Sequence, residues 1–148
     1  MRTPLYLEDI AVGQRFVTAS VVIDEEAIKN FARQFDPQPF HLDNAAAEKS
    51  FFKGLAASGW HTAALTMKLQ VESGPLLAGG MIGASGEVTW PRPTRPGDEL
   101  HVESEVLAVT PSRSKPDRGF VTLKSQTLNQ RGEAVQVQTA KLLVWRRP

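Results

Sequence analysis

An aspartate and a histidine, two residues suited to proton transfer, lie five positions apart in the first third of the chain. Asp36 and His41 belong to the segment Phe-Asp-Pro-Gln-Pro-Phe-His-Leu-Asp, which places Pro37 and Pro39 between them. Histidine titrates near neutral pH, and a carboxyl group can share general acid–base catalysis with it. Because prolines restrict the backbone, we expect both side chains to be held in place, as catalysis requires.

The surroundings of Asp36 should disfavour its charged form. We expect a helix to end just before this residue, and the C-terminal end of a helix carries negative partial charge. Phe35 and Phe40 add apolar surface on either side of the motif. Both effects raise the pKa of a carboxyl group. We therefore predict that the pKa of Asp36 lies above its usual value.

A second candidate feature is the pair Ser58 and Gly59, which precedes Trp60. A helix that begins here leaves the backbone N–H of Gly59 free at the positive end of the helix dipole. Such an amide can donate a hydrogen bond to an oxyanion. Tight packing is the alternative reason for glycine at this position, and both reasons can hold. Ser58 either caps the helix or binds a substrate carbonyl.

The first half of the chain carries the helical patterns. β-branched residues over 15–23 predict a strand, after which Asp24 can cap an amphipathic helix over 25–35. A short helix should follow near 45–49. A longer helix over 60–73 has a wide apolar stripe, so we expect it to be buried. The stripe consists of Trp60, Ala63, Ala64, Met67 and Val71.

The second half of the chain reads as four strands, over 80–90, 99–109, 119–129 and 134–145, with a hairpin turn between the last two. This order predicts one α+β domain over residues 1–148, with an antiparallel sheet wrapped around the long helix. An exposed sheet edge usually pairs with another strand. We therefore expect a homodimer, and a higher oligomer stays open.

Composition excludes several classes of function. The 148 residues are 41% hydrophobic and include no cysteine, so thiol nucleophiles, iron–sulfur clusters and disulfides are ruled out. A net charge of +1 argues against a dedicated nucleic-acid-binding protein. The three histidines, at 41, 61 and 101, lack the spacing of metal ligands. We predict no metal and no nucleic acid.

The chain has no evident membrane or export signal. Its most apolar window, 76–84, is broken by glycines and is too short to span a bilayer. Acidic residues and a proline interrupt the first nine residues before an apolar stretch forms, which is unlike a signal peptide. We expect a cytoplasmic protein that does not interact with membranes.

Three segments in combination are similar to one known family. They read Asp36-Pro-Gln-Pro-Phe-His41-Leu-Asp, Gly54-Leu-Ala-Ala-Ser58-Gly59-Trp60-His61-Thr62 and Trp90-Pro-Arg92-Pro-Thr-Arg95-Pro-Gly97-Asp98. The chain resembles, over most of its length, the MaoC-like dehydratases, which are the (R)-specific enoyl-CoA hydratases of the hot-dog fold. The resemblance implies a long helix wrapped by a sheet and a dimer with its active site at the interface.

The resemblance also implies roles for individual residues. Asp36 and His41 would hold and activate a water molecule, and the N–H of Gly59 would polarise a thioester carbonyl. The family usually has asparagine two positions after the aspartate, whereas this chain has Gln38. This departure bears on the positioning of the catalytic loop and on the substrate more than on the reaction class.

The remaining candidates concern substrate binding. They are Gln38, Phe40, Ser58, Arg92 and Arg95. Either arginine could bind the phosphates of coenzyme A, although arginines in a loop are often simply solvated. We expect His61 to be a hydrogen-bonded histidine near the dimer interface, and Trp60 and Met67 to be core residues.

Three functions stay open. The first is reversible hydration of a 2-enoyl thioester of coenzyme A to the (R)-3-hydroxyacyl thioester, with no cofactor beyond the coenzyme A of the substrate. The second is an acyl-CoA thioesterase of the same fold. The third is a non-catalytic acyl-CoA-binding or partner subunit. The histidine partner of Asp36, on a segment before the long helix, favours hydration over hydrolysis.

Overall fold

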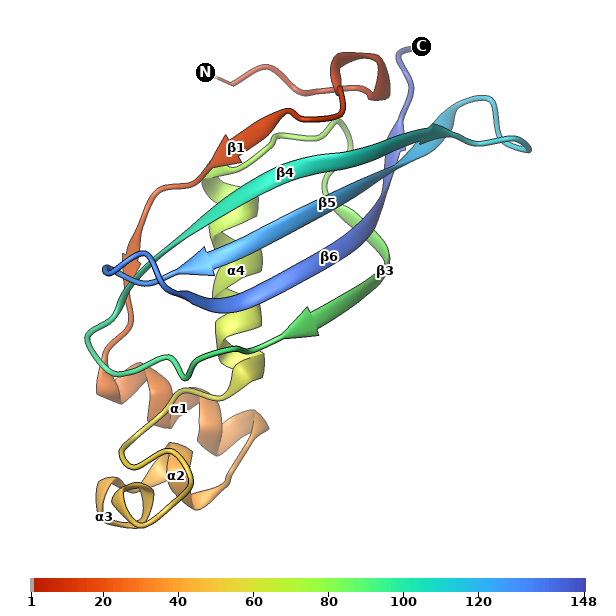
Figure 1. Cartoon of the computed structure of the whole chain (residues 1–148). Coiled ribbons are helices and arrows are strands. Elements are labelled where there is room, and N and C mark those ends of the chain that lie inside the picture. The colour runs from red at the N-terminus through yellow and green to blue at the C-terminus, as the bar shows by residue number, and fades with distance from the viewer. Residues whose placement is uncertain (1) are drawn as a thin grey trace.

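The strands form one antiparallel sheet. The computed structural model describes residues 2–148, so Met1 of the expected 1–148 domain lies outside the description. Over this range the strand order is β1-β4-β5-β6-β3, and β2 also pairs with β4 (Figure 1). The strands are β1 (Arg15–Val17), β2 (Val21–Val22), β3 (Ile82–Thr89), β4 (Glu99–Pro111), β5 (Arg118–Leu128) and β6 (Ala134–Trp145).

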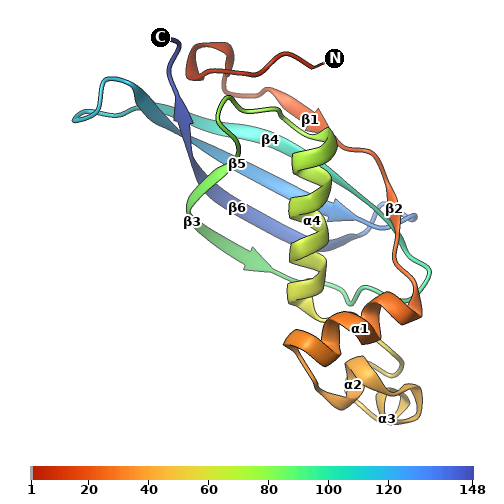
Figure 2. The same ribbon diagram turned by 180° about the vertical axis from the view of Figure 1, so that it is seen from behind.

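The helices precede most of the sheet in the chain. They are the 3-10 turn η1 (Leu7–Asp9), α1 (Glu25–Phe35), α2 (Pro39–Leu42), α3 (Asn44–Glu48) and α4 (Gly59–Ser73). Helix α4 lies across one face of the sheet, and α1 to α3 gather at its N-terminal end (Figure 2). None of the helices in residues 2–148 is both long enough and apolar enough to cross a membrane.

Local sequence explains where the helices begin. The Asp24 carboxylate accepts a hydrogen bond of 2.8 Å from the N–H of Ala27, and Asp43 caps α3 in the same way through Ala46. Helix α1 ends at Phe35, before Pro37, because proline cannot continue the hydrogen-bond pattern. The expected helices over 25–35 and 45–49 are confirmed to within a residue or two.

The expected strand over 15–23 is interrupted. Thr18 donates its N–H to the carbonyl of Val102, and its hydroxyl accepts from the N–H of Val102 at 2.9 Å. The side chain thus takes the place of a backbone partner, and the strand divides into β1 and β2. The predicted hairpin between β5 and β6 is confirmed, with Gly132 at a φ of 75° in the turn.

The burial of α4 differs from the prediction. Its apolar stripe faces outward in the single chain, where Trp60 is 62% exposed, Met67 45% and Val71 53%. The face toward the sheet is polar and buried, and it includes Thr62, Thr66 and Gln70. The expectation of a core stripe, with Trp60 and Met67 as core residues, is therefore wrong for the single chain.

Hydrogen bonds allow this polar face to be buried, because unpaired buried polar groups are costly. Gln70 donates to the hydroxyl of Ser125 at 2.7 Å, and Ser125 contacts Ser104 at 2.8 Å. One turn earlier, Thr66 contacts Thr127 across 2.5 Å. Helix α4 is thereby fixed in register on the sheet.

Two apolar clusters flank this polar layer. One joins Leu7 and Leu77 to the sheet residues Val106, Leu123 and Leu142, and the other surrounds the fully buried Ile28, Leu100 and Val135. The second cluster includes Ile28 of α1 and Leu55 of the loop before α4, and Phe40 packs against it, so it anchors the segments next to Asp36 and His41.

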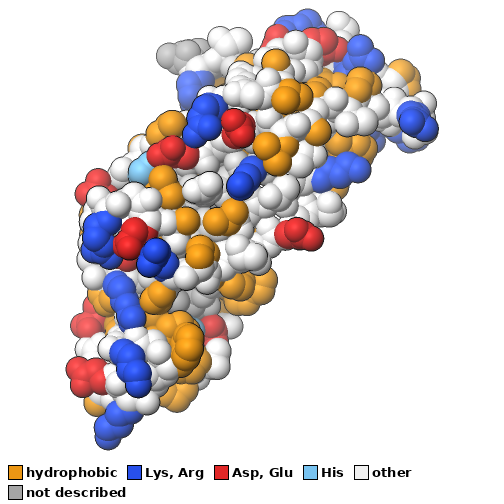
Figure 3. All heavy atoms as spheres, in the orientation of Figure 1, with side chains coloured by type: hydrophobic (Ala, Val, Ile, Leu, Met, Phe, Trp, Pro, Cys, Tyr) orange, Lys and Arg blue, Asp and Glu red, His pale blue; other side chains and the backbone are white. Residues whose placement is uncertain are grey.

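The face of the sheet opposite α4 carries interspersed acidic and basic side chains (Figure 3). Arg15 on β1, for example, lies 3.7 Å from Glu103 and 3.4 Å from Glu105 on β4. Neither sign of charge dominates this face.

Candidate active site

A cavity of about 540 Å³ opens at the N-terminal end of α4. Its lining brings together Asp36, His41, Ser58, Gly59 and Arg92, five residues selected from the sequence. They come from the end of α1, from α2, from the start of α4 and from the proline-rich loop after β3. Residues from four elements of the chain therefore face one space.

His41 is fixed by a backbone carbonyl. Its Nδ1 lies 2.6 Å from the oxygen of Ala56, and the side chain is almost fully buried. Since a carbonyl only accepts, Nδ1 carries the hydrogen of this bond. In neutral histidine the Nε2 lone pair is then free, and Nε2 lies 3.3 Å from Oδ2 of Asp36. The prediction of a rigid loop here missed α2, a single turn that begins at Pro39.

Asp36 lies at the C-terminal end of α1. Burial raises the pKa of its carboxyl group. Hydrogen bonds from Gln38 and Ser58, together with the electrostatic effect of the nearby His41, outweigh burial, so the pKa is lowered overall. The bond from Nε2 of Gln38 to Oδ1 is 2.5 Å long. The predicted rise in pKa is therefore wrong, because hydrogen bonds to the charged form outweigh desolvation. Asp36 is an ionised acceptor at neutral pH.

Ser58 and Gly59 form the first turn of α4. The Ser58 hydroxyl accepts from the N–H of Trp60 at 3.2 Å, which confirms the predicted cap. Among residues 2–148 the Gly59 N–H has no hydrogen-bond partner. A Cβ on Gly59 would lie only 2.7 Å from Cε2 of Trp90, so packing also requires glycine.

Three of the predicted substrate-binding residues lie outside the cavity lining. Gln38 acts on Asp36, as described above. Phe40 packs edge-on against His41, with ring centroids 4.7 Å apart, and so supports the imidazole from behind. Arg95 donates to the carbonyls of Gly54 and Leu55 at 2.9 and 3.2 Å, and also to Phe52. This guanidinium holds the loop before α4 and does not line the cavity.

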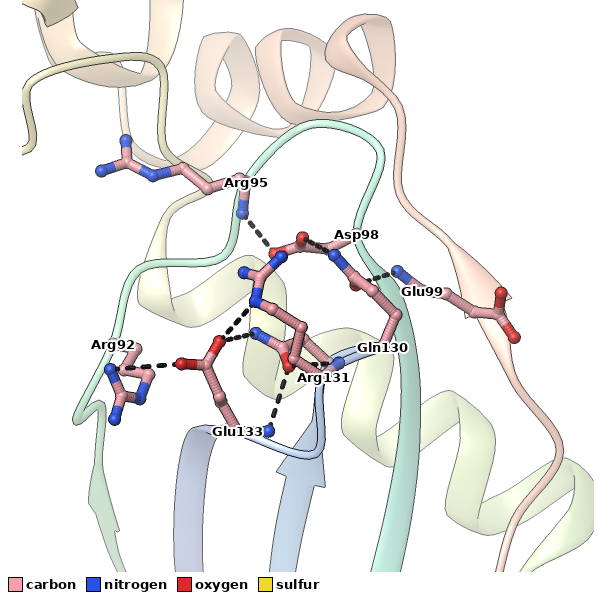
Figure 4. A network of polar contacts seen from close by, with 8 residues as sticks. Arg92, Arg95, Asp98, Glu99, Gln130, Arg131 and Glu133 are labelled. Carbon is pink, nitrogen blue, oxygen red and sulfur yellow. Dashed lines mark hydrogen bonds and ion pairs between the residues drawn. The ribbon is translucent and has the colours of Figure 1, made fainter.

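Arg92 remains available at the rim of the cavity. Its side chain is 57% exposed and lies 3.5 Å from Glu133 in the hairpin between β5 and β6 (Figure 4). The same hairpin contacts Asp98, which accepts from Gln130 at 3.0 Å and from the N–H of Arg95 at 2.8 Å. The hairpin therefore braces the loop that carries Arg92.

Sequence reasoning assigned no role to Trp90, Phe51, Thr62 or Thr94, which also line the cavity. Thr62, Trp90 and Thr94 lie in the segments that resemble the family, and this was the signal available for them. Thr62 and Thr94 contact each other through their hydroxyls at 2.9 Å and join α4 to the loop.

His61 differs from expectation. Its Nδ1 is buried and lacks a hydrogen-bond partner within residues 2–148. The ring stacks on Phe31 with centroids 4.6 Å apart, and burial lowers its pKa. It is a neutral packing residue in the single chain rather than a hydrogen-bonded one. No cluster of three or more potential metal-ligating side chains occurs in residues 2–148.

The fold and this site define a class of protein. The model of the MaoC like domain matches residues 9–128, so the chain belongs to that family. Its architecture is the hot-dog fold that the resemblance implied.

Individual relatives extend this result. The structure of the MaoC-like dehydratase from Rhodospirillum rubrum has 65% identity and a TM-score of 0.96, covering 97% of this chain and 99% of that one. The unliganded R-hydratase PhaJ1 from Pseudomonas aeruginosa has 27% identity and a TM-score of 0.76, covering 97% and 88%. YdeM of Bacillus subtilis is 36% identical in an alignment of 129 residues that covers 84% of this chain and 88% of that protein. The family thus includes dehydratases and hydratases.

Proposed function

We propose that this protein is a hydro-lyase that reversibly adds water to a 2-enoyl thioester of coenzyme A, giving the (R)-3-hydroxyacyl thioester. The observation that carries the proposal is the pairing of Asp36 with His41 in a cavity that also contains the Gly59 amide. An ionised carboxylate and an imidazole nitrogen face each other across 3.3 Å, and when the imidazole is in its neutral form both accept hydrogen bonds. A water molecule has two hydrogens to donate to such a pair.

The charges determine the order of events. Water held by Asp36 and His41 directs an oxygen lone pair at the β carbon of the substrate. As the new C–O bond forms, one O–H bond of the water breaks and its proton passes to Asp36. The C=C electron pair shifts toward the thioester carbonyl, and negative charge develops on the carbonyl oxygen. The enolate then takes a proton at the α carbon from the protonated Asp36–His41 pair, which restores the carbonyl and returns the pair to its starting state. Positioned proton transfer of this kind contributes roughly 10²–10⁴-fold.

The Gly59 amide serves the second half of this chemistry. Negative charge develops on the thioester oxygen, and a fixed N–H at the positive end of a helix stabilises it. One such donor contributes roughly 10²–10³-fold. Because the helix holds the amide before the substrate arrives, no reorganisation is needed in the transition state.

Substrate binding and assembly complete the proposal. We propose that Arg92, at the cavity rim, forms an ion pair with a phosphate of coenzyme A in place of its ion pair with Glu133. The outward apolar face of α4 and the exposed edge strand β3 are surfaces that a second copy would cover. We therefore propose a homodimer.

The test is the loss of enoyl-thioester absorbance when purified protein is added to enoyl-CoAs of graded chain length. Asp36→Asn and His41→Ala should each lose most of the activity. His101→Ala and Asp117→Asn are matched controls outside the cavity and should keep it. Full activity in both site variants would contradict the assigned roles.

The same assay separates the alternatives. Release of free thiol from an acyl-CoA, without hydration, indicates a thioesterase. Binding of acyl-CoA by calorimetry, with no turnover at any chain length, indicates a non-catalytic subunit.

A further inference from the structure

The indole of Trp90 occupies the space where any other residue at position 59 would place its Cβ. That atom would lie 2.7 Å from Cε2, 2.8 Å from Cδ2 and 3.0 Å from Cζ2 of Trp90. Trp90 lines the cavity beside Gly59, and its ring also meets Trp60 edge to face at 5.1 Å. The wall next to the Gly59 amide is thus one aromatic side chain packed against the Gly59 backbone.

A buried hydrogen-bond chain fixes this indole. Trp90 donates from Nε1 to Oε1 of Gln136 at 3.0 Å. Gln136 is 0% exposed and donates in turn to the hydroxyl of Thr66 at 3.3 Å. Thr66 donates its own hydroxyl hydrogen to the carbonyl of Thr62, at 2.9 Å, one turn nearer to Gly59. These hydrogen bonds therefore lead from Trp90 in the cavity wall, through Gln136 on β6, to α4, the helix that begins with the Gly59 amide.

Burying the polar Gln136 side chain beside the indole costs more free energy than burying an apolar side chain there would. A fully buried amide side chain is tolerated only when its groups are hydrogen-bonded, whereas methionine of similar size would fill the same space. Packing alone does not require an acceptor for Nε1. Fixing the orientation of the ring does require such an acceptor, because an indole without one can rotate about its side-chain torsions.

We infer that Trp90 is a positioning residue for the Gly59 amide and that Gln136 is its anchor, an inference that rests on the proposed hydratase function. Trp90 keeps the N–H directed at the place where the thioester oxygen becomes an enolate. It also covers the amide with apolar surface, which strengthens a hydrogen bond to a charged acceptor.

A double-mutant cycle tests the inference. Trp90→Phe removes the Nε1 donor, and Gln136→Met removes the acceptor at similar volume. Each should lower kcat roughly tenfold, below the ~100-fold that an ångström of misplacement can cost. KM should change little, because the interaction matters in the transition state. The double variant should also lose roughly tenfold, and not ~100-fold, because both changes break one interaction.

A matched control accounts for lost stability. Ser104→Ala removes a buried hydroxyl that contacts Gln70 on α4 and Ser125 on the neighbouring strand, away from the cavity. It should lower the melting temperature but leave kcat unchanged. If it lowers kcat as much as Gln136→Met, or if the two cavity-side losses multiply, Trp90 is only a packing residue and the inference is overturned.

A spectroscopic measurement separates this inference from the proposed function. A saturated acyl-CoA cannot be hydrated, and the infrared stretch of its bound thioester carbonyl reports the hydrogen bond from Gly59. The wild-type protein should shift this band to lower frequency, and both single variants should shift it less. Equal shifts in all three proteins, with an active wild type, overturn the role of Trp90 but leave the proposed hydratase function standing. A wild type that neither shifts the band nor hydrates any enoyl-CoA overturns both proposals.

Discussion

Gln38 donates a hydrogen bond of 2.5 Å from its Nε2 to Oδ1 of Asp36. This bond leaves Oδ2 of the same carboxylate free to face His41. Gln38 does not line the cavity and therefore acts through Asp36. The family resemblance places asparagine at this position, and the longer glutamine supplies the same amide donor to the carboxylate. Its effect on catalysis should consequently be an effect on the pKa of Asp36.

Replacing Gln38 by methionine should raise the pKa of Asp36. The hydrogen bond from Gln38 stabilises the charged carboxylate and so lowers the pKa of Asp36. Methionine cannot make this bond. Because Asp36 must be ionised to accept a proton from water, the acid limb of kcat/KM should move to higher pH. The rate on the plateau above that limb should change much less. A pH profile of kcat/KM measures both quantities.

Two further variants make this prediction specific. Gln38→Asn keeps an amide and should stay closer to the wild-type profile. Gln34→Met changes an exposed glutamine on α1 and should leave the profile unmoved. An acid limb that does not move in Gln38→Met shows that Asp36 does not titrate in that limb.

Gly59→Ala should lose activity through a clash that can be stated in advance. The new Cβ would lie 2.7 Å from Cε2 of Trp90, which no side chain tolerates without movement. Overpacking of this kind costs about 1–3 kcal/mol of stability. Displacing the amide or the indole should lower kcat roughly 100-fold.

Gly83 offers the matched control for Gly59. A Cβ there would meet nothing within 4 Å in the single chain, and strands at a sheet edge pair through their backbones, so Gly83→Ala should keep the melting temperature and kcat near the wild-type values. Thermal melts and steady-state rates are measured for both variants. Wild-type kcat in Gly59→Ala would remove this amide from the mechanism.

Met67→Lys should separate the proposed homodimer. Met67 is 45% exposed on the outward face of α4 in the single chain, and a second copy would bury it. Burying an unpaired lysine at an interface is strongly unfavourable. Sedimentation equilibrium should show a dimer for the wild type and a monomer for the variant. Lys68→Gln, at the adjacent exposed position, should remain dimeric; a wild type that sediments as a monomer contradicts the proposal.

Much of the fold follows from local sequence signals. Asp24 and Ser58 cap the helices where their types and positions indicate. The four long strands lie within a few residues of the ranges predicted for the second half of the chain. The orientation of α4 does not follow from the same signals. An apolar stripe reports only that some surface covers it, and the sheet in fact takes the polar face of Thr66 and Gln70. Which face meets the sheet depends on hydrogen-bond partners distant in the chain.

The site shows the same division. The types and spacing of Asp36 and His41 were sufficient to predict that they lie together, and the structure places them 3.3 Å apart. The direction of the Asp36 pKa shift was predicted wrongly, because it depends on donors from Gln38 and Ser58 whose orientation no spacing rule gives. Trp90 was missed for a related reason, since its contact with Gly59 joins residues 31 positions apart.

Glu8→Gln should weaken a connection between the two ends of the chain in a pH-dependent manner. Glu8 accepts from the backbone N–H of Arg147 and from Nε of Arg146, both at 2.9 Å, and these bonds lower its pKa from 4.5 to about 2. A depressed pKa stabilises the fold above the unfolded-state value, and this stabilisation is lost as the pH falls toward the folded-state value. Urea unfolding should therefore show the variant less stable than the wild type at neutral pH, with the difference shrinking between pH 4.5 and about 2. Glu48→Gln, an exposed change on α3, should show no such convergence, and a constant difference at all pH values for Glu8→Gln would mean that its charge does not contribute.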